Sequence, residues 1–283
     1  MSHKCVIAVV SGKGGTGKTT VATNLFLTVE DSALFDCDVE EPNAHLFLRA
    51  DLQTTEPVSI AVPKVREDVC TGCRKCQEVC NFNAIAVMDK KVLVFSELCH
   101  SCGACFYFCP VGALEEERKE IGTLTQATVG SRRFVFGTLK VGEMMAPPLI
   151  RAVKEKIDGS RYTVIDAPPG TSCPMITAAK ASDFCVLVTE PTPFGLHDLQ
   201  IALNVVRDLK IPHGVIINRD GLGTRLVDDF CAEENVPVLM RIPFDRRIAE
   251  HYSRGTPIVE AMPEYKAAFQ NVFNHIEKEC EKR

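Results

Sequence analysis

The chain has 283 residues, of which 46% are hydrophobic and 24% are charged, and its formal net charge is −5. This length allows one large domain or two ordinary ones, with enough apolar residues for a sizeable core. The negative charge argues against a general nucleic-acid-binding protein, and no run of about 18 apolar residues predicts a membrane helix. Since the N-terminal residues lack signal-peptide features, we expect a cytoplasmic protein without membrane or nucleic-acid partners.

The first predicted strand covers residues 4–10 and leads into a glycine-rich segment. Residues 12–19 fit the pattern G-x-x-x-x-G-K-[ST] of a phosphate-binding P-loop, and a helix is predicted from Thr19 to about Val29. In this pattern backbone N–H groups surround phosphate oxygens, Lys18 neutralises the phosphate charge, and the Thr19 hydroxyl ligates Mg²⁺. The predicted nucleotide-binding residues here are Gly12, Lys13, Gly14, Gly15, Thr16, Gly17, Lys18, Thr19 and Thr20.

An acidic turn follows the next predicted strand, which covers residues 32–37. A carboxylate at the C-terminal end of a strand beside a P-loop can orient the attacking water or hold the water shell of Mg²⁺. Asp38, one of the carboxylates of this turn, is a candidate for this catalytic and Mg²⁺-associated role. A solvated acidic turn is the alternative interpretation, above all for Asp36, Glu40 and Glu41.

Eight of the fourteen cysteines lie between residues 70 and 109, in two sets that each read C-x2-C-x2-C-x3-C. This is the spacing of bacterial two-cluster ferredoxins, in which the fourth cysteine of each set ligates the other cluster. Asn81 stands where the first set would usually have proline, a departure that affects no ligand. The spacing predicts two [4Fe–4S] clusters, one held by Cys70, Cys73, Cys76 and Cys109, the other by Cys99, Cys102, Cys105 and Cys80.

Zinc sites and disulfides are the alternatives for these cysteines. Zinc sites usually pair two C-x2-C units, and disulfides need an oxidising compartment that nothing in the sequence indicates. The two sets also form an internal repeat with an offset of 29 residues. We therefore predict a ferredoxin domain at about residues 63–118, inserted into a discontinuous domain made of residues 1–62 and 119–283.

The rest of the chain alternates predicted strands and helices. Strands are expected at residues 162–165, 184–189, 215–218 and 236–243, and helices at about 195–209 and from about 263 onward. This alternation predicts an α/β fold with a doubly wound, mainly parallel sheet. The strand at 162–165 ends in Asp166, which suits a second Mg²⁺-associated carboxylate. The last helix has apolar residues at helical spacing, so we expect it to pack on the core rather than on a membrane.

Four segments resemble the MinD/Mrp/ParA superfamily of P-loop ATPases, which is related to the nitrogenase iron protein. They are K-G-G-T-G-K-T at 13–19, V-E-E-P-N at 39–43, C-H-S-C-G-A-C at 99–105 and D-A-P-P-G-T-S-C-P at 166–174. Together they are similar to members with an inserted ferredoxin domain, some of which resemble components of the orange-protein complex. The C-terminal C-x-x-C of scaffold-type Mrp proteins is absent.

The resemblance assigns roles to individual residues. Lys13 is implied to reach across a dimer to the partner's nucleotide, and Asp38 to be the switch I aspartate. Asn218 and Arg219 match the place where the class reads adenine, and the absence of N-K-x-D favours ATP over GTP. Cys173 is either a buried small hydrophobe or a thiol at the dimer interface.

The implied protein is a Mg²⁺-dependent ATPase that binds ATP or ADP and forms a nucleotide-dependent homodimer, or pairs with a paralogue. One hypothesis is a role in iron–sulfur or metal-cluster assembly and delivery to a client protein. The second is an ATP-gated electron carrier similar to the nitrogenase iron protein, acting on a redox client. A redox-sensing positioning ATPase like MinD or ParA is the third.

Overall fold

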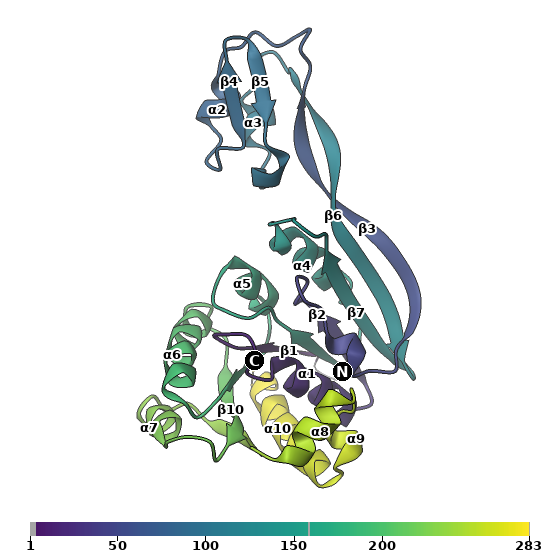
Figure 1. Ribbon diagram of the computed structural model, residues 1–283, viewed down its shortest axis with the longest axis vertical. Coiled ribbons are helices and arrows are strands. Elements are labelled where there is room, and N and C mark those ends of the chain that lie inside the picture. Colours follow the sequence, from purple (N-terminus) through teal and green to yellow (C-terminus); the bar gives the residue numbers. More distant parts are fainter. Residues whose placement is uncertain (1–3, 158, 283) are drawn as a thin grey trace.

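A computed structural model of the chain shows a large body, a small module and a two-stranded ribbon that connects them (Figure 1). We call residues 66–113 the module, strands β3 (Asp51–Val65) and β6 (Leu114–Val129) the ribbon, and the remainder the body. The structure describes residues 4–157 and 159–282. Residues 1–3, 158 and 283, which the predicted domain limits include, lie outside the described residues.

A nine-stranded sheet with the order β11-β10-β9-β1-β8-β2-β7-β6-β3 forms the centre of the body, and its last two strands, β6 and β3, continue into the ribbon. Neighbouring strands are parallel from β11 to β7, whereas β6 pairs antiparallel with both β7 and β3. The mainly parallel α/β sheet predicted from the sequence is therefore confirmed. Its other strands are β1 (Cys5–Val10), β2 (Ser32–Asp36), β7 (Arg132–Leu139), β8 (Tyr162–Asp166), β9 (Phe184–Thr189), β10 (His213–Asp220) and β11 (Val238–Pro243).

Helices cover both faces of this sheet. The strands are continuous apolar runs because alternate side chains enter different cores: Ile7 and Val9 of β1 pack on one face, Ala8 and Val10 on the other. The first core includes α1 (Lys18–Thr28), α9 (Ile258–Ala261) and α10 (Glu264–Cys280), with α8 (Arg246–Ser253) packed on α9. The second includes α4 (Ala146–Glu155), α5 (Cys173–Ala179), α6 (Pro193–Asp208) and α7 (Leu226–Glu233).

The last helix packs on the body, as its apolar spacing predicts. Its residues Phe269, Val272, Phe273 and Ile276 are buried in the first of these cores. Within the described ranges, no helix is both long and apolar enough to cross a bilayer.

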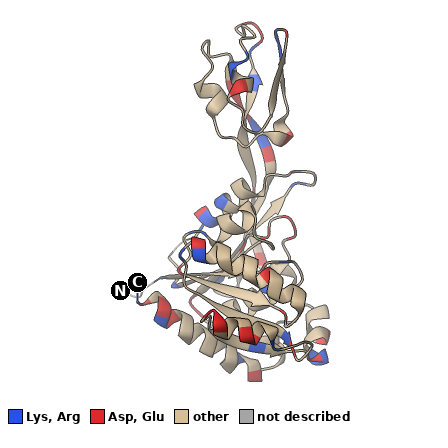
Figure 2. Ribbon diagram, turned by 90° about the vertical axis from the view of Figure 1, so that its left-hand side faces the viewer, with Lys and Arg blue, Asp and Glu red and all other residues tan. Residues whose placement is uncertain are grey.

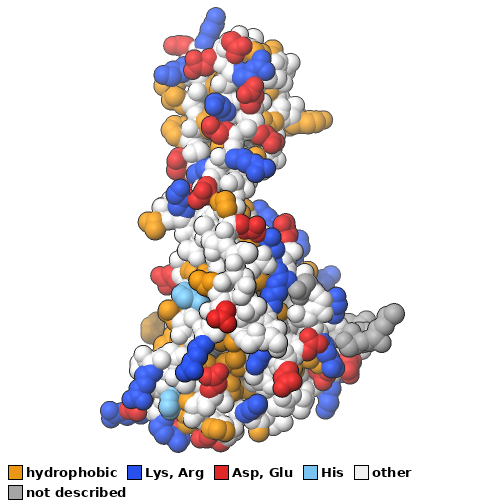
Figure 3. Space-filling view, turned by 90° about the vertical axis from the view of Figure 1, so that its right-hand side faces the viewer, with side chains coloured by type: hydrophobic (Ala, Val, Ile, Leu, Met, Phe, Trp, Pro, Cys, Tyr) orange, Lys and Arg blue, Asp and Glu red, His pale blue; other side chains and the backbone are white. Residues whose placement is uncertain are grey.

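The ribbon carries the module away from the body, and a narrow neck separates the two in the space-filling view (Figure 3). The module holds α2 (Lys75–Glu78), η2 (Ser96–Leu98), α3 (Ala104–Tyr107) and a hairpin of β4 (Ile85–Met88) and β5 (Lys91–Val94). The ribbon strands were not predicted, and both run without interruption through the limits expected at residues 62/63 and 118/119. The domain limits of the ferredoxin insertion stay a prediction.

The root of the ribbon is irregular and is fastened to the body. Val58 faces Gly122 and Ser59 faces Glu120, so Ile121 is an extra residue in β6, a β-bulge. The Lys140 N–H donates to the Ile121 carbonyl oxygen at 2.9 Å.

Lys119 forms a second connection between module and body. Its ammonium lies 2.6 Å from the Glu143 carboxylate of the body and donates to the Ser96 carbonyl oxygen of the module at 3.3 Å. The Glu143 side chain is only 5% exposed. The ribbon is therefore not a free tether, because its base is bonded to both parts.

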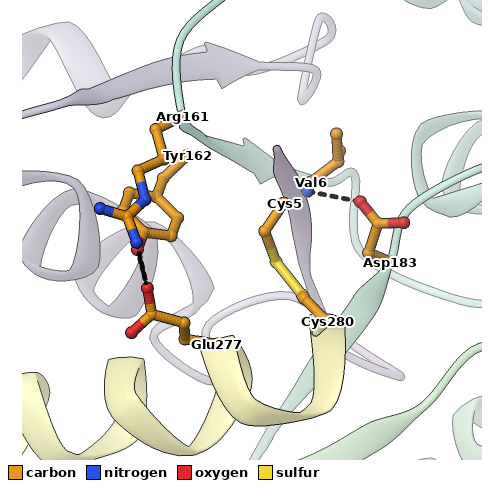
Figure 4. Close-up of a disulfide and its surroundings, with 7 residues drawn as sticks. All are labelled: Cys5, Val6, Arg161, Tyr162, Asp183, Glu277 and Cys280. Carbon is orange, nitrogen blue, oxygen red and sulfur yellow. Dashed lines mark hydrogen bonds and ion pairs between the residues drawn. A yellow bond between two sulfur atoms is a disulfide. The ribbon is translucent and has the colours of Figure 1, made fainter. Parts of the chain in front are cut away.

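A disulfide joins Cys5 at the start of β1 to Cys280 at the end of α10, 275 residues apart in sequence. In Figure 4 the Glu277 carboxylate points toward Arg161 and Tyr162, with which it forms hydrogen bonds. The sequence analysis considered disulfides only for the eight clustered cysteines and did not identify this one. The bond ties the last helix to the strand that leads into the P-loop.

We expect Gly122→Ala to destabilise the body. A Cβ atom at this position would lie 2.4 Å from the Thr138 carbonyl oxygen and 2.9 Å from Leu149 Cδ2. Since backbone cannot move aside as a flexible side chain can, the free energy of unfolding should fall by about 1–3 kcal/mol. Urea denaturation measures the change, with Thr123→Ala as the control on the neighbouring, half-buried residue. Equal stability of Gly122→Ala and the wild type would contradict this packing.

Candidate nucleotide site and cysteine cavities

A cavity of about 350 Å³ opens at the C-terminal ends of β1, β2 and β10. This edge of an open α/β sheet is where ligands generally bind. The predicted site residues that line it are Gly14, Gly15, Gly17, Lys18, Thr19, Thr20, Asp38, Asn218 and Arg219. Gly12, Lys13, Thr16 and Asp166 belong to the same segments but do not line the cavity.

Close backbone contacts explain the glycines of the loop. Gly17 has φ 95°, and a Cβ there would lie 2.3 Å from the Asn218 side-chain nitrogen. That nitrogen donates to the Thr16 carbonyl oxygen at 2.8 Å, so the end of β10 braces the P-loop. A Cβ at Gly12 would lie 2.2 Å from the Asp198 carbonyl oxygen. Helix α1 then starts at Lys18, and the unpaired N–H groups at such a helix start favour phosphate.

Lys18 interacts with the carboxylates of Asp38 and Asp166, and Asp36 interacts with both of these carboxylates. The Lys18 nitrogen lies 3.7 Å from Asp38, and Asp36 and Asp166 are fully buried on adjacent strands. Asp36 accepts hydrogen bonds from the backbone N–H groups of Asp38 at 3.0 Å and Ala44 at 3.1 Å, so it shapes the loop that carries Asp38. Sequence reasoning left Asp36 undecided, and the structure excludes a solvated turn for it.

The charge balance of this cluster favours a cation. Burial raises the pKa of Asp36 and of Asp166, and it raises the pKa of Asp38 to about 6 although Lys18 opposes that shift. Both oxygens of Asp166 are buried without a hydrogen-bond partner. Unpaired carboxylate oxygens next to the Thr19 hydroxyl are donors that suit Mg²⁺, which usually combines one or two carboxylates with substrate phosphates.

The eight clustered cysteines line two separate cavities in the module. The first cavity is lined by Cys70, Cys73, Cys76 and Cys109, and the second by Cys80, Cys99, Cys102 and Cys105. Each cavity thus gathers three cysteines of one set and the fourth of the other, which is the grouping expected from the spacing. In residues 4–157 and 159–282, no group of three or more His, Cys, Asp or Glu side chains could hold a single metal ion.

The backbone around the two cavities repeats with the 29-residue offset of the sequence. Left-handed φ values pair Gly72 (69°) with Ser101 (53°), and Arg74 (66°) with Gly103 (78°). Asn83 and Gly112 form a third such pair, at 53° and 61°. The two halves of the module therefore fold around their cavities in the same way.

Backbone N–H groups also point at the cysteine sulfurs. Ala84 donates to Cys80 at 3.3 Å, and Ala113 donates to Cys109 at 3.2 Å. Burial raises the pKa of the Cys105 thiol to about 11. A cysteine thiol releases its proton when it binds a metal centre. Four cysteines around one cavity therefore fit a cluster that is ligated by thiolates.

The sequence analysis missed the other end of the nucleotide-sized cavity. That end is lined by residues of β11 and α8, namely Pro243, Phe244, Asp245, Ile248, Ala249 and Tyr252. These residues could have been inferred from the segment Phe244-Asp245, because it directly follows the strand predicted at residues 236–243. Glu190, which was not among the predicted site residues, has its carboxylate 3.8 Å from Lys13 and 2.6 Å from Arg219.

Cys173 is exposed at the start of α5. The interpretation as a buried small hydrophobe is therefore wrong, because the chain turns this residue outward after the Pro168-Pro169-Gly170 segment. Its place at a dimer interface stays a prediction.

The raised pKa of Asp38 predicts an unusual pH dependence for Asp38→Asn. A carboxyl pKa raised from 3.8 to about 6 stabilises the fold below about pH 4, and this stabilisation is lost as the pH rises through 6. Asparagine has no charge to bury. In protein free of metal and nucleotide, the free energy of unfolding of Asp38→Asn relative to wild type should therefore rise by up to about 3 kcal/mol from pH 4 to pH 8. Urea denaturation in EDTA measures this, and a pH-independent difference would refute it; Glu115→Gln is the exposed control.

Comparison with known proteins places the chain in a family. Residues 7–258 match the model of the CobQ/CobB/MinD/ParA nucleotide binding domain. The chain is 30% identical over 261 residues to an uncharacterised protein of Methanocaldococcus jannaschii, covering 90% of this chain and 91% of that protein. It is 23% identical over 290 residues to an iron-sulfur cluster carrier protein of Pyrococcus horikoshii, covering 93% and 83%.

A solved structure shares the fold. The septum site-determining protein MinD of Pyrococcus horikoshii, complexed with Mg-ADP, superposes with a TM-score of 0.57 at 21% identity, over 97% of this chain and 96% of that one. The P-loop, the sheet order and the family match agree with one another. The chain belongs to the CobQ/CobB/MinD/ParA family of P-loop nucleotide-binding proteins.

Proposed function

We propose that the chain is a Mg²⁺-dependent ATPase that couples ATP binding, hydrolysis and dimer closure to the assembly or delivery of iron–sulfur or other metal clusters. ATP hydrolysis is supported at the level of the family. The observation that carries the rest is the pair of four-cysteine cavities in a module bonded to the P-loop sheet. The similarity to a protein described as an iron-sulfur cluster carrier also supports a role in cluster assembly or delivery.

The nucleotide would bind in the cavity at the P-loop. Lys18 and the N–H groups at the start of α1 neutralise its phosphates, and Thr19 and Asp166 provide oxygens for Mg²⁺. Asp38 orients the attacking water. Asn218 and Arg219 line the cavity on the β10 side, where they would contact the adenine. The Mg²⁺ ion, not the anionic nucleotide, would compensate negative charge on the buried carboxylates.

Lys13 would act on the nucleotide of a second subunit. Its side chain does not line the cavity of its own subunit and instead lies against Glu190, which supports a role across the dimer. In that role its ammonium stabilises the charge that develops on the transferred phosphoryl group.

The two four-cysteine cavities would hold one [4Fe–4S] cluster each, and the clusters would supply electron storage or transferable iron–sulfur units. The chain's own contribution is the thiolates and the N–H groups that point at them. The fold encloses each set on the module, away from the nucleotide (Figure 1).

A continuous series of contacts links the Asp38 loop to the module, which supports coupling. The Leu139 N–H donates to the Val39 carbonyl oxygen at 2.7 Å, directly after Asp38. The next residue, Lys140, bonds to Ile121 in the ribbon bulge, and Lys119 bonds to the module. A shift of the Asp38 loop on nucleotide binding would therefore reach the base of the ribbon.

An ATP-gated electron carrier is the second candidate function. The eight cysteines complete both cavities inside one module, which favours stable centres over cargo that must leave. A positioning ATPase is less well supported, because the C-terminal helix buries its apolar side chains in the body. Reduction potentials measured with and without Mg·ATP separate the candidates, since a gated carrier requires a nucleotide-dependent potential.

Anaerobically purified protein should contain about eight irons per chain. Cys76→Ser and Cys105→Ser should each reduce the iron content and alter a different low-temperature EPR signal, because they line different cavities. Cys231→Ser, which changes a buried cysteine of the body, is the control and should keep the full iron content. Stoichiometric zinc without an EPR signal on reduction would contradict the cluster assignment.

The ATPase proposal predicts different defects for three variants. Lys18→Ala should abolish nucleotide binding, since it removes the ammonium that faces the phosphates. Lys13→Ala and Asp38→Ala should retain binding but lose hydrolysis, for Lys13 by about 1,000-fold, because their roles are confined to the transition state. Nucleotide titration and phosphate release measure the two steps. Undiminished hydrolysis by Lys13→Ala would rule out its action across the dimer.

A further inference from the structure

Glu190 holds two cations with one carboxylate beside the P-loop. It follows the last residue of β9, and its side chain is 11% exposed. Oε1 accepts a hydrogen bond from Arg219 at 2.6 Å, while Oε2 lies 3.8 Å from the Lys13 ammonium. Glu190 thus joins the residue expected to reach the partner's nucleotide to a residue expected to contact the adenine.

The position of Glu190 is fixed by its own backbone. The Thr192 N–H donates to the Glu190 carbonyl oxygen at 2.8 Å. A Cβ at Gly195 would lie 2.2 Å from that same oxygen, so α6 starts in direct contact with Glu190. Arg219 is also constrained, with φ 54° and its N–H bonded to the Asn218 side-chain oxygen. The backbones of Glu190 and Arg219 are therefore fixed before any ligand arrives, and the 2.6 Å hydrogen bond joins their side chains.

Lys13 is held less firmly than these two. Its backbone is fixed, since the Ser11 hydroxyl donates to the Lys13 carbonyl oxygen at 2.6 Å. Its side chain is 35% exposed, and the contact with Glu190 is an ion pair without a direct hydrogen bond. Lys18, by comparison, is 6% exposed and lines the cavity. An ammonium held by one weak ion pair can exchange that anion for another.

We propose that Glu190 is a positioning residue that retains Lys13 on its own subunit until the phosphates of the partner's nucleotide compete for it. The inference rests on the proposed function, in which Lys13 acts in the closed dimer. In the proposed closure, the phosphates of the other subunit draw the Lys13 ammonium away from Glu190. Closure then breaks the Lys13–Glu190 pair, so Glu190 raises the protein concentration at which the dimer forms. Arg219 keeps the carboxylate in place for Lys13 to return.

Glu190→Gln removes the negative charge that pairs with Lys13 and keeps the size of the side chain. Glutamine has the same length, and its carbonyl oxygen still accepts a hydrogen bond from Arg219. Acetylation of Lys13 by acetic anhydride in nucleotide-free protein, followed by mass spectrometry, should become about 2–5-fold faster, the range of a partly exposed ion pair. With Mg²⁺ and a non-hydrolysable ATP analogue, the dimer should form at a similarly lower protein concentration in analytical ultracentrifugation.

Two further variants make the test specific. Glu234→Gln breaks the ion pair between Glu234 and Arg207 of α6, whose side chain is 38% exposed, close to the 35% of Lys13, and it should change neither measurement. In a Lys13→Gln background, Glu190→Gln should no longer promote dimer formation, because the ammonium it released is gone. A gain that persists in this background would overturn the proposal.

The proposal also fails if Lys13 is acetylated equally fast in Glu190→Gln and wild type, or if Glu190→Gln raises the concentration needed for the dimer. A wild-type protein that forms no dimer with nucleotide would refute the proposed dimer closure instead. Acetylation of Lys13 needs no nucleotide, so it still decides whether Glu190 holds Lys13.

Discussion

The close packing of the P-loop backbone against its neighbours is the constraint on which the candidate site depends. Gly17 lies so near Asn218, and Gly12 so near Asp198, that no side chain fits at either glycine. These contacts join the end of β1 to the end of β10 and to α6. They fix where α1 begins and leave Lys18 facing the cavity. The same packing turns Lys13 away, toward Glu190.

The electrostatics of the site follow from burial. Asp36, Asp38 and Asp166 share the interior with one ammonium, while charges of both signs are scattered over the rest of the surface (Figure 2). Buried carboxylates with raised pKa values are unfavourable when ionised and without a cation. The fold tolerates this arrangement because backbone N–H groups bind Asp36 and because the Lys18 ammonium lies 3.7 Å from Asp38. Charge placement of this kind suits a binding site better than a structural core.

The ribbon gives the molecule its two-part form. Its lower half completes the sheet of the body, and its upper half leads to the module beyond the neck (Figure 3). The bulge at Ile121 and the double contact of Lys119 lie where these halves meet. Strand β7 lies between β2 and the ribbon. Hydrogen bonds from Leu139 and Lys140, at the end of β7, therefore connect the loop that carries Asp38 to the base of the ribbon.

The sequence by itself determined the features that depend on short-range spacing. Continuous apolar runs marked the parallel strands, glycine spacing marked the P-loop, and the repeated cysteines gave the grouping found in the two cavities. The ribbon was not predicted because β3 is mostly exposed, and its residues do not alternate between apolar and polar as in a strand that packs on a core. Contacts between distant segments were decided by the tertiary structure alone: Asn218 against Gly17, Glu190 against Lys13, and Cys280 bonded to Cys5. No local pattern encodes such pairs, because they exist only once the strands and helices have taken their places around the sheet.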